Sequence, residues 1–104
     1  MAIHIICRYN QARSIIGAAA IRKFLPDVEV TSSGVDALKD SSIPDSVRVI
    51  ANEWNLPIIE TSAKSFTSIL DEISVNDLVL AADSYVAQSV ERIRPDIEVK
   101  AFMD

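Results

Sequence analysis

Short apolar segments that alternate with helical patterns constrain the fold of this chain more than any other feature. The first segment, Ala2 to Cys7, is rich in isoleucine and predicts a buried parallel strand. Further strands are predicted at 28–31, 77–82 and 97–102, and helices at 14–25, 44–56, 62–73 and 84–94. Alternating strands and helices predict an α/β fold, with a four-stranded, mostly parallel sheet and helices on both faces.

Prolines and capping residues mark the ends of these helices. Pro26 and Pro57 are expected to end helices, because proline cannot donate a backbone hydrogen bond, whereas Pro44 suits a first turn. Asp83 or Ser84 can cap the last helix. Apolar residues at helical spacing predict a face that packs on the core, formed by Val47, Ile50, Ala51 and Trp54.

Length and composition limit the classes of protein. The 104 residues suffice for one domain, predicted here as residues 1–104. A net charge of -5 without a basic stripe argues against nucleic acid as a partner. One cysteine and one histidine exclude a disulfide within the chain and a His/Cys metal cluster, so no metal or other cofactor is expected. Without an apolar run of membrane length or a leader pattern, we expect no membrane partner and a cytoplasmic location.

The segment from Cys7 to Ser14 combines groups that bind oxyanions. In parallel sheets ligands bind at the carboxyl ends of strands, where Cys7 is expected to lie. The loop then enters a helix whose free N–H groups and dipole favour an anion and a thiolate. Arg13 can hold two oxygens of a phosphate with its planar fork. The other residue of chemical interest, His4, lies within the first strand and is expected in the core.

The pattern Cys-x5-Arg-Ser between a strand and a helix resembles the phosphate-binding loop of the low-molecular-weight protein tyrosine phosphatases, and thus the phosphotyrosine phosphatase I-like fold. The turn Ser32-Ser33-Gly34 and the strand from Asp77 match too. The resemblance implies that Cys7 is the nucleophile and forms a phosphocysteine. It implies that Arg13 clamps the phosphoryl oxygens and that Ser14 stabilises the departing thiolate. Asn10 would hold the loop in shape, with Ser32 as its partner.

The rest of the loop is expected to bind phosphate and to line the site. Main-chain N–H groups from Arg8 through Tyr9, Asn10, Gln11 and Ala12 to Arg13 would contact the phosphate. Arg8 and Tyr9 can line the substrate mouth, with Tyr9 stacking on an aryl ring. The family usually has glycine where this chain has Tyr9, so strain in the loop or a narrower mouth is expected. It often has a second cysteine where this chain has Ala12.

The carboxyl-terminal part departs from the family. The family's general acid is an aspartate in an Asp-Pro loop, and the chain contains no Asp-Pro dipeptide. The family's last helix is also missing, so we expect a shortened form with one sheet face uncovered, which favours self-association.

Three functions stay open at this point. The first is hydrolysis of phosphomonoesters, with a phosphorylated protein, above all phosphotyrosine, or a small aryl phosphate as substrate. The second is reduction of arsenate with an external thiol, because arsenate has the shape of phosphate and that reaction needs one cysteine. The third is binding of phosphate or phosphotyrosine without turnover.

Overall fold

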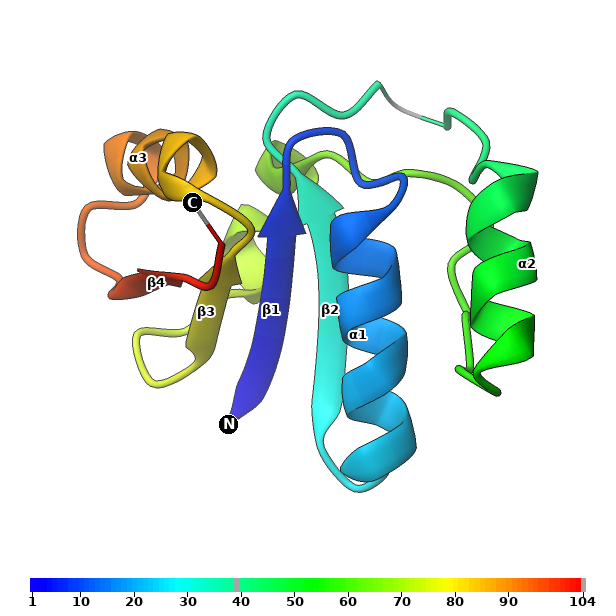
Figure 1. Cartoon of the computed structure of the whole chain (residues 1–104). Coiled ribbons are helices and arrows are strands. Elements are labelled where there is room, and N and C mark those ends of the chain that lie inside the picture. The colour runs from blue at the N-terminus through cyan, green and yellow to red at the C-terminus, as the bar shows by residue number, and fades with distance from the viewer. Residues whose placement is uncertain (39, 104) are drawn as a thin grey trace.

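A four-stranded sheet with all neighbouring strands parallel forms the centre of the molecule (Figure 1). The computed structural model describes residues 1–38 and 40–103. The strands, in the spatial order β2-β1-β3-β4, are β1 (Ala2–Cys7), β2 (Glu29–Gly34), β3 (Leu78–Ala81) and β4 (Val99–Ala101). The helices are α1 (Arg13–Phe24), α2 (Asp45–Glu53), the 3-10 helix η1 (Phe66–Glu72) and α3 (Ser84–Ile93). The predicted α/β class with a parallel sheet is confirmed.

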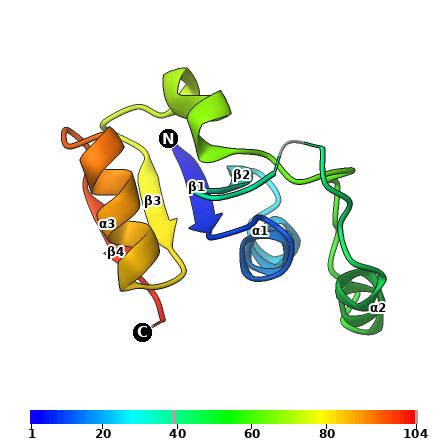
Figure 2. The same ribbon diagram turned by 90° about the horizontal axis from the view of Figure 1, so that it is seen from above.

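Helices lie on both faces of the sheet (Figure 2). On one face, α1 packs on β1 and β2 through Ala18, Ile3 and Val30. On the other face, η1 and α3 pack on the sheet through a larger cluster that includes Phe66 and Val86. The alternation of side chains along each strand explains why neighbouring residues of β1 enter different clusters.

The second strand continues further than the sequence predicted. The residues Ser32-Ser33-Gly34, predicted as a turn, form the last half of β2, and Cys7 pairs with Gly34 in the parallel ladder. The pairing places Gly34 beside Cys7, where the loop from Cys7 to Arg13 (the phosphate loop) begins. The polar composition concealed the strand, because serine and glycine favour turns when they stand alone.

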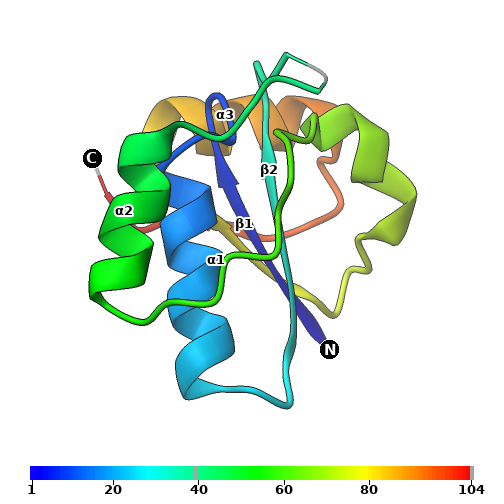
Figure 3. The same cartoon turned by 90° about the vertical axis from the view of Figure 1, so that its right-hand side faces the viewer.

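Only half of the predicted core face of α2 is buried. Val47 and Ala51 are buried as expected, but Ile50 is 48% exposed and Trp54 is 68% exposed. Helix α2 ends at Glu53, so Trp54 lies at the carboxyl-terminal cap. Figure 3 shows α2 at the side of α1, away from the sheet, where it can bury only a narrow stripe.

The predicted core position of His4 is confirmed, since the residue is 2% exposed. Its Nε2 lies 2.8 Å from an Asp77 carboxylate oxygen, and its Nδ1 lies 2.6 Å from the Thr31 hydroxyl. These contacts tie β1 to β2 and to the segment before β3. In the part of the chain that the structure describes, no helix is long and apolar enough to cross a membrane.

Candidate active site

The sulfur of Cys7 lies at the base of a hydrogen-bonded loop between β1 and α1. Its Sγ is 2.9 Å from the Ser14 hydroxyl and 3.1 Å from the Asn10 backbone nitrogen. The Ser14 oxygen already accepts a hydrogen bond from the Asn10 side-chain amide, at 2.8 Å. Its own hydrogen is therefore free to point at the sulfur. Two hydrogen-bond donors can thus be directed at one sulfur.

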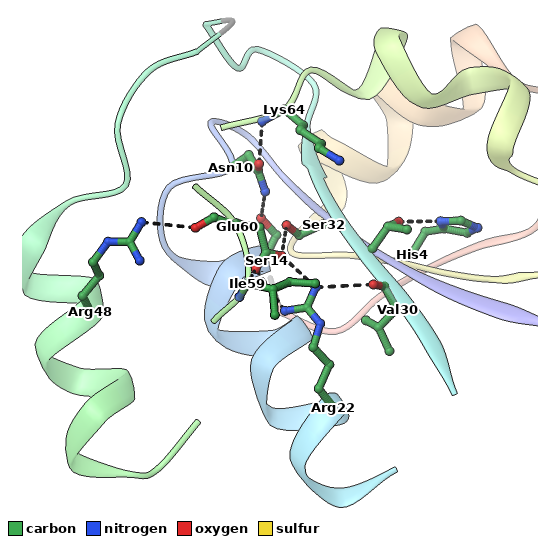
Figure 4. A network of polar contacts seen from close by, with 11 residues as sticks. His4, Asn10, Ser14, Arg22, Val30, Ser32, Arg48, Ile59, Glu60 and Lys64 are labelled. Atoms are coloured by element: carbon green, nitrogen blue, oxygen red, sulfur yellow. Dashed lines mark hydrogen bonds and ion pairs between the residues drawn. The ribbon is translucent and has the colours of Figure 1, made fainter. Parts of the chain in front are cut away.

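Asn10 holds the loop in a conformation that few residues adopt. Its φ of 54° lies in the left-handed region, where asparagine is better tolerated than most side chains. Besides its bond to Ser14, its side-chain oxygen accepts a hydrogen bond from the Lys64 backbone N–H, at 2.7 Å. Figure 4 shows this chain of contacts behind the loop. Asn10 thus joins the loop to the segment after α2.

The predicted partner of Asn10, Ser32, makes a different contact. The Ser32 hydroxyl donates to the carboxylate of Glu60, at 2.6 Å, and Glu60 also accepts two hydrogen bonds from the Arg22 guanidinium (Figure 4). Burial alone would raise the pKa of Glu60, but the hydrogen bonds from Arg22 and Ser32 hold it below its usual value. Ser32 therefore supports the sheet edge behind the loop, and Lys64 takes the role predicted for it.

The backbone of Gly34 lies so close to the loop that no residue with a Cβ atom would fit at this position. A Cβ on Gly34 would be 2.6 Å from the Asn10 nitrogen and 2.8 Å from the Arg8 carbonyl oxygen. The backbones also bond here, from the Val35 N–H to the Cys7 carbonyl, at 3.0 Å. The expected strain at Tyr9 is absent, because positive φ occurs at Asn10 and not at Tyr9 in the described residues. The closest packing against the loop thus occurs at Gly34, on the neighbouring strand β2.

Arg13 and the sulfur share one cavity of about 260 Å³. Its lining consists of Cys7, Tyr9, Gln11, Ala12, Arg13, Pro44, Ser46 and Val47. Cys7 is only 3% exposed, and this cavity borders it. The Arg13 Nη1 donates to Asp83, at 2.9 Å, which leaves its other N–H groups for an oxyanion.

Asp83 connects Arg13 to the start of α3. One of its carboxylate oxygens caps that helix by accepting from the Val86 N–H, and the other accepts from Arg13. These two contacts, that of Val86 first, lower the pKa of Asp83. An ionised carboxylate beside Arg13 fixes the guanidinium but cannot donate a proton.

The other predicted loop residues divide into two groups. Tyr9, which was predicted at the mouth, lines the cavity together with Gln11 and Ala12. The side chain of Arg8 instead bonds Asp36 outside the cavity lining, with Nε 2.9 Å from a carboxylate oxygen. The contributions of Lys64 and Asp83 were missed. The first acts through its main chain, and the second was noticed only as a helix cap.

Within residues 1–38 and 40–103, no three histidine, cysteine, aspartate or glutamate side chains gather as a metal site would need. Positive charge for an oxyanion at Cys7 is supplied by Arg13 and the amino terminus of α1. The site thus has the form of a cysteine-based oxyanion site.

Comparison with known proteins gives the same class. No family model matches the chain. The probable low molecular weight protein-tyrosine-phosphatase AmsI of Erwinia amylovora is 26% identical over 101 residues, covering 97% of this chain and 69% of AmsI. The probable phosphatase EpsP of Ralstonia nicotianae is 33% identical over 94 residues, covering 89% of this chain and 63% of EpsP. The crystal structure of the tyrosine phosphatase Wzb from Escherichia coli K30 in complex with sulphate matches with a TM-score of 0.82 and 29% identity, covering 98% of this chain and 70% of Wzb.

The fold is the α/β fold of the phosphotyrosine phosphatase I-like proteins. The chain is similar to low molecular weight protein-tyrosine phosphatases over nearly its whole length, as its sequence predicted. It spans about two thirds of the length of these relatives, from 63% of EpsP to 69% of AmsI.

Proposed function

We propose that the chain hydrolyses phosphomonoesters through a phosphocysteine on Cys7, with phosphotyrosine as the leading substrate. The observation that carries the proposal is the pair of donors, Ser14 Oγ and Asn10 N, at the Cys7 sulfur. A buried cysteine that serves only packing needs no such donors. The names of AmsI and EpsP, both probable protein-tyrosine phosphatases, support the same substrate class.

In the first step, the Cys7 thiolate attacks phosphorus. A sulfur–phosphorus bond forms, the bond from phosphorus to the ester oxygen breaks, and the leaving group departs with the electron pair of that bond. Arg13 and the loop N–H groups hold the three equatorial oxygens, where charge is concentrated in the transition state. The leaving oxygen takes a proton from solvent or from an acid.

In the second step, water attacks the phosphocysteine. A phosphorus–oxygen bond forms, the sulfur–phosphorus bond breaks, and phosphate leaves while the water gives up a proton. Cys7 returns to the thiolate, which the Ser14 hydroxyl stabilises by donating a hydrogen bond at 2.9 Å. Ser14 therefore acts mainly on this step.

Leaving-group protonation is the weak point of the described site. Asp83 is the carboxylate bonded to Arg13, and its lowered pKa keeps it ionised. Aryl esters, whose phenolate leaves readily, need a general acid less than alkyl esters do. We therefore propose aryl phosphates, including phosphotyrosine in proteins, as the substrates.

We further propose a cytoplasmic location and an assembly of more than one copy. A cytoplasmic location fits a single cysteine in a reducing compartment. We also propose self-association through the α1 face of β3, where Leu78 and Leu80 pack on the core cluster beneath α1 but remain only half-buried. That residues 1–104 form one phosphatase-like domain stays part of the same proposal.

Assays on a single preparation distinguish this proposal from its two alternatives. We expect hydrolysis of p-nitrophenyl phosphate by the unchanged protein and none by Cys7→Ser. Arsenate reduction that depends on an added thiol, without phosphate ester hydrolysis, would favour the reductase. Binding of phosphate by calorimetry without either reaction would favour a binding module. Unchanged hydrolysis by Cys7→Ser would contradict the nucleophile assignment.

A further inference from the structure

The guanidinium of Arg8 lies between two tyrosines at the outer side of the phosphate loop. Its central carbon is 5.2 Å from the centre of the Tyr9 ring and 4.8 Å from the centre of the Tyr85 ring. Tyr9 belongs to the loop, whereas Tyr85 belongs to the first turn of α3. A planar guanidinium stacks on aromatic rings with a favourable cation–π energy. Arg8 thereby links the loop to α3.

Asp36 holds the Arg8 guanidinium and the Tyr85 ring in place by accepting a hydrogen bond from each. One oxygen of its carboxylate accepts hydrogen bonds from Arg8 Nε and from the Tyr85 hydroxyl, both at 2.9 Å. Its backbone N–H in turn donates to the Arg8 carbonyl oxygen, at 2.7 Å. The arginine is therefore held at its side chain and its main chain by one residue. Such a two-point attachment is stronger than a single exposed ion pair.

Tyr9 is the member of the stack that also lines the cavity containing Cys7. The residue thus contacts Arg8 through its ring and also borders the cavity. Tyr9 is 49% exposed, and an unsupported side chain with that exposure would sample several rotamers. Contact with Arg8 restricts it before any ligand arrives, which lowers the entropy cost of binding.

We propose that Asp36, Arg8 and Tyr85 are positioning residues that hold Tyr9 as a fixed aromatic wall, so that the site selects aryl over alkyl phosphomonoesters. The proposal rests on the proposed function, because it needs a phosphoryl group bound at Cys7. It goes further by assigning specificity to a second set of residues, of which Tyr85 and Asp36 lie outside the loop. An aryl ring stacked on Tyr9 gains a contact that an alkyl chain lacks.

The test compares two ligands that cannot be hydrolysed. Benzylphosphonate and ethylphosphonate share the phosphonate group, and the ratio of their dissociation constants reports the aromatic contact. We expect Tyr85→Ala to lower the preference for benzylphosphonate about 2- to 10-fold, the range of one aromatic contact. Tyr85→Phe keeps the ring and should retain most of the preference. Tyr9→Leu, which removes the wall itself, should lower it at least as much as Tyr85→Ala.

A general loss of stability or loop geometry lowers both affinities and leaves their ratio unchanged, so the ratio separates positioning from folding. Arg92→Ala, at an exposed arginine of the same helix, serves as the matched control. An unchanged ratio in both Tyr85→Ala and Tyr9→Leu would overturn the proposal while the proposed function stands. If the unchanged protein bound neither phosphonate nor inorganic phosphate, the proposed function would fail and this proposal with it.

Discussion

The two sides of the phosphate loop are built from different interactions. On the buried side, Asn10, Ser14 and the Lys64 main chain form a chain of hydrogen bonds without a charged side chain in it. On the exposed side, Arg8 and Asp36 form an ion pair with Tyr85 attached. The buried contacts end at the sulfur, whereas the exposed contacts end at an aromatic wall. One side thus sets the chemistry and the other sets the choice of ligand.

The difference between buried hydrogen bonds and an exposed ion pair predicts that mutations on the two sides of the loop have unequal effects. A buried polar group that loses its partner costs about 1–3 kcal/mol, because water cannot replace the lost bond. An exposed ion pair contributes about 0–1 kcal/mol. Substitutions on the buried side should therefore impair folding and turnover, and those on the exposed side should change selectivity.

The largest effect is expected at Arg13, which enters the cavity between the two sides. Arg13→Ala should lose oxyanion binding and lower turnover of p-nitrophenyl phosphate about 10²–10³-fold, the loss typical of one strong transition-state donor. Arg13→Lys keeps the charge but not the fork, and we expect it to recover only part of the loss. Steady-state kinetics and phosphate calorimetry measure both. Near-normal activity of Arg13→Ala would show that another group holds the phosphoryl oxygens.

The close approach of Gly34 gives the next effect and comes with a matched control. Gly34→Ala puts a Cβ 2.6 Å from the Asn10 nitrogen, so the loop must shift, at a cost of about 3 kcal/mol in the free energy of unfolding. Gly17→Ala, in α1, meets only the Ile5 side chain, at 3.3 Å, and should change stability by less than about 1 kcal/mol. Urea unfolding with phosphate calorimetry provides the measurement. Equal stabilities for the two variants would mean that the loop does not depend on this contact.

Removing the Ser14 hydroxyl should slow one chemical step more than the other. Ser14→Ala takes a hydrogen bond from the Cys7 thiolate, worth about 2 kcal/mol for a charged acceptor, or roughly 30-fold in rate. The loss falls on hydrolysis of the phosphocysteine, in which sulfur is the leaving group. A burst of p-nitrophenol, followed by a slow steady rate, is the expected stopped-flow trace. A slow rate without a burst would place the role of Ser14 in the first step.

Asp77 makes partly buried hydrogen bonds far from the loop and tests whether such polar contacts stabilise the fold more than exposed ones do. Desolvation opposes ionisation of Asp77, but the N–H groups of Ala2 and Ser74, with the His4 ring, lower its pKa to about 2. A depressed pKa contributes stability at pH values above the unfolded pKa near 3.8, and this contribution is lost as the pH falls towards 2.

Asp77→Asn should therefore lower the free energy of unfolding at pH 7 by on the order of 2 kcal/mol, with little change in phosphate affinity. The stability difference between the two proteins should shrink between pH 4 and pH 2. Denaturant titrations across that range, followed by circular dichroism, measure it. A difference that stays constant with pH would contradict the assigned ionisation.

The sequence allowed most strands and helices to be predicted, because these elements depend on local residue patterns. Apolar runs indicated β1 and β3, and the cap at Asp83 follows from its position before α3. Trp54 was misplaced, since helical spacing cannot tell whether a helix packs on the sheet or beside it. The turn predicted at Ser32 proved to be strand, because a parallel partner can extend a polar segment.

The contacts that complete the site could not be read from residue types. Lys64 acts through its N–H, which every residue except proline has, so nothing in its side chain indicates the role. Ser32 and Glu60 are 28 residues apart, and no local pattern joins them. The resemblance to a family predicted that Asn10 holds the loop in shape, but no residue pattern predicted its left-handed backbone.

Trapping the reaction intermediate tests the central claim most directly. The protein is mixed with p-nitrophenyl phosphate, quenched in acid within the first turnovers, digested and examined by mass spectrometry. Ser14→Ala is included because its slowed second step should raise the trapped fraction. We expect one added phosphoryl group on the peptide that contains Cys7, and none in Cys7→Ser treated in the same way. Hydrolysis that proceeds with no phosphoryl group on Cys7 in either active protein would contradict the central claim.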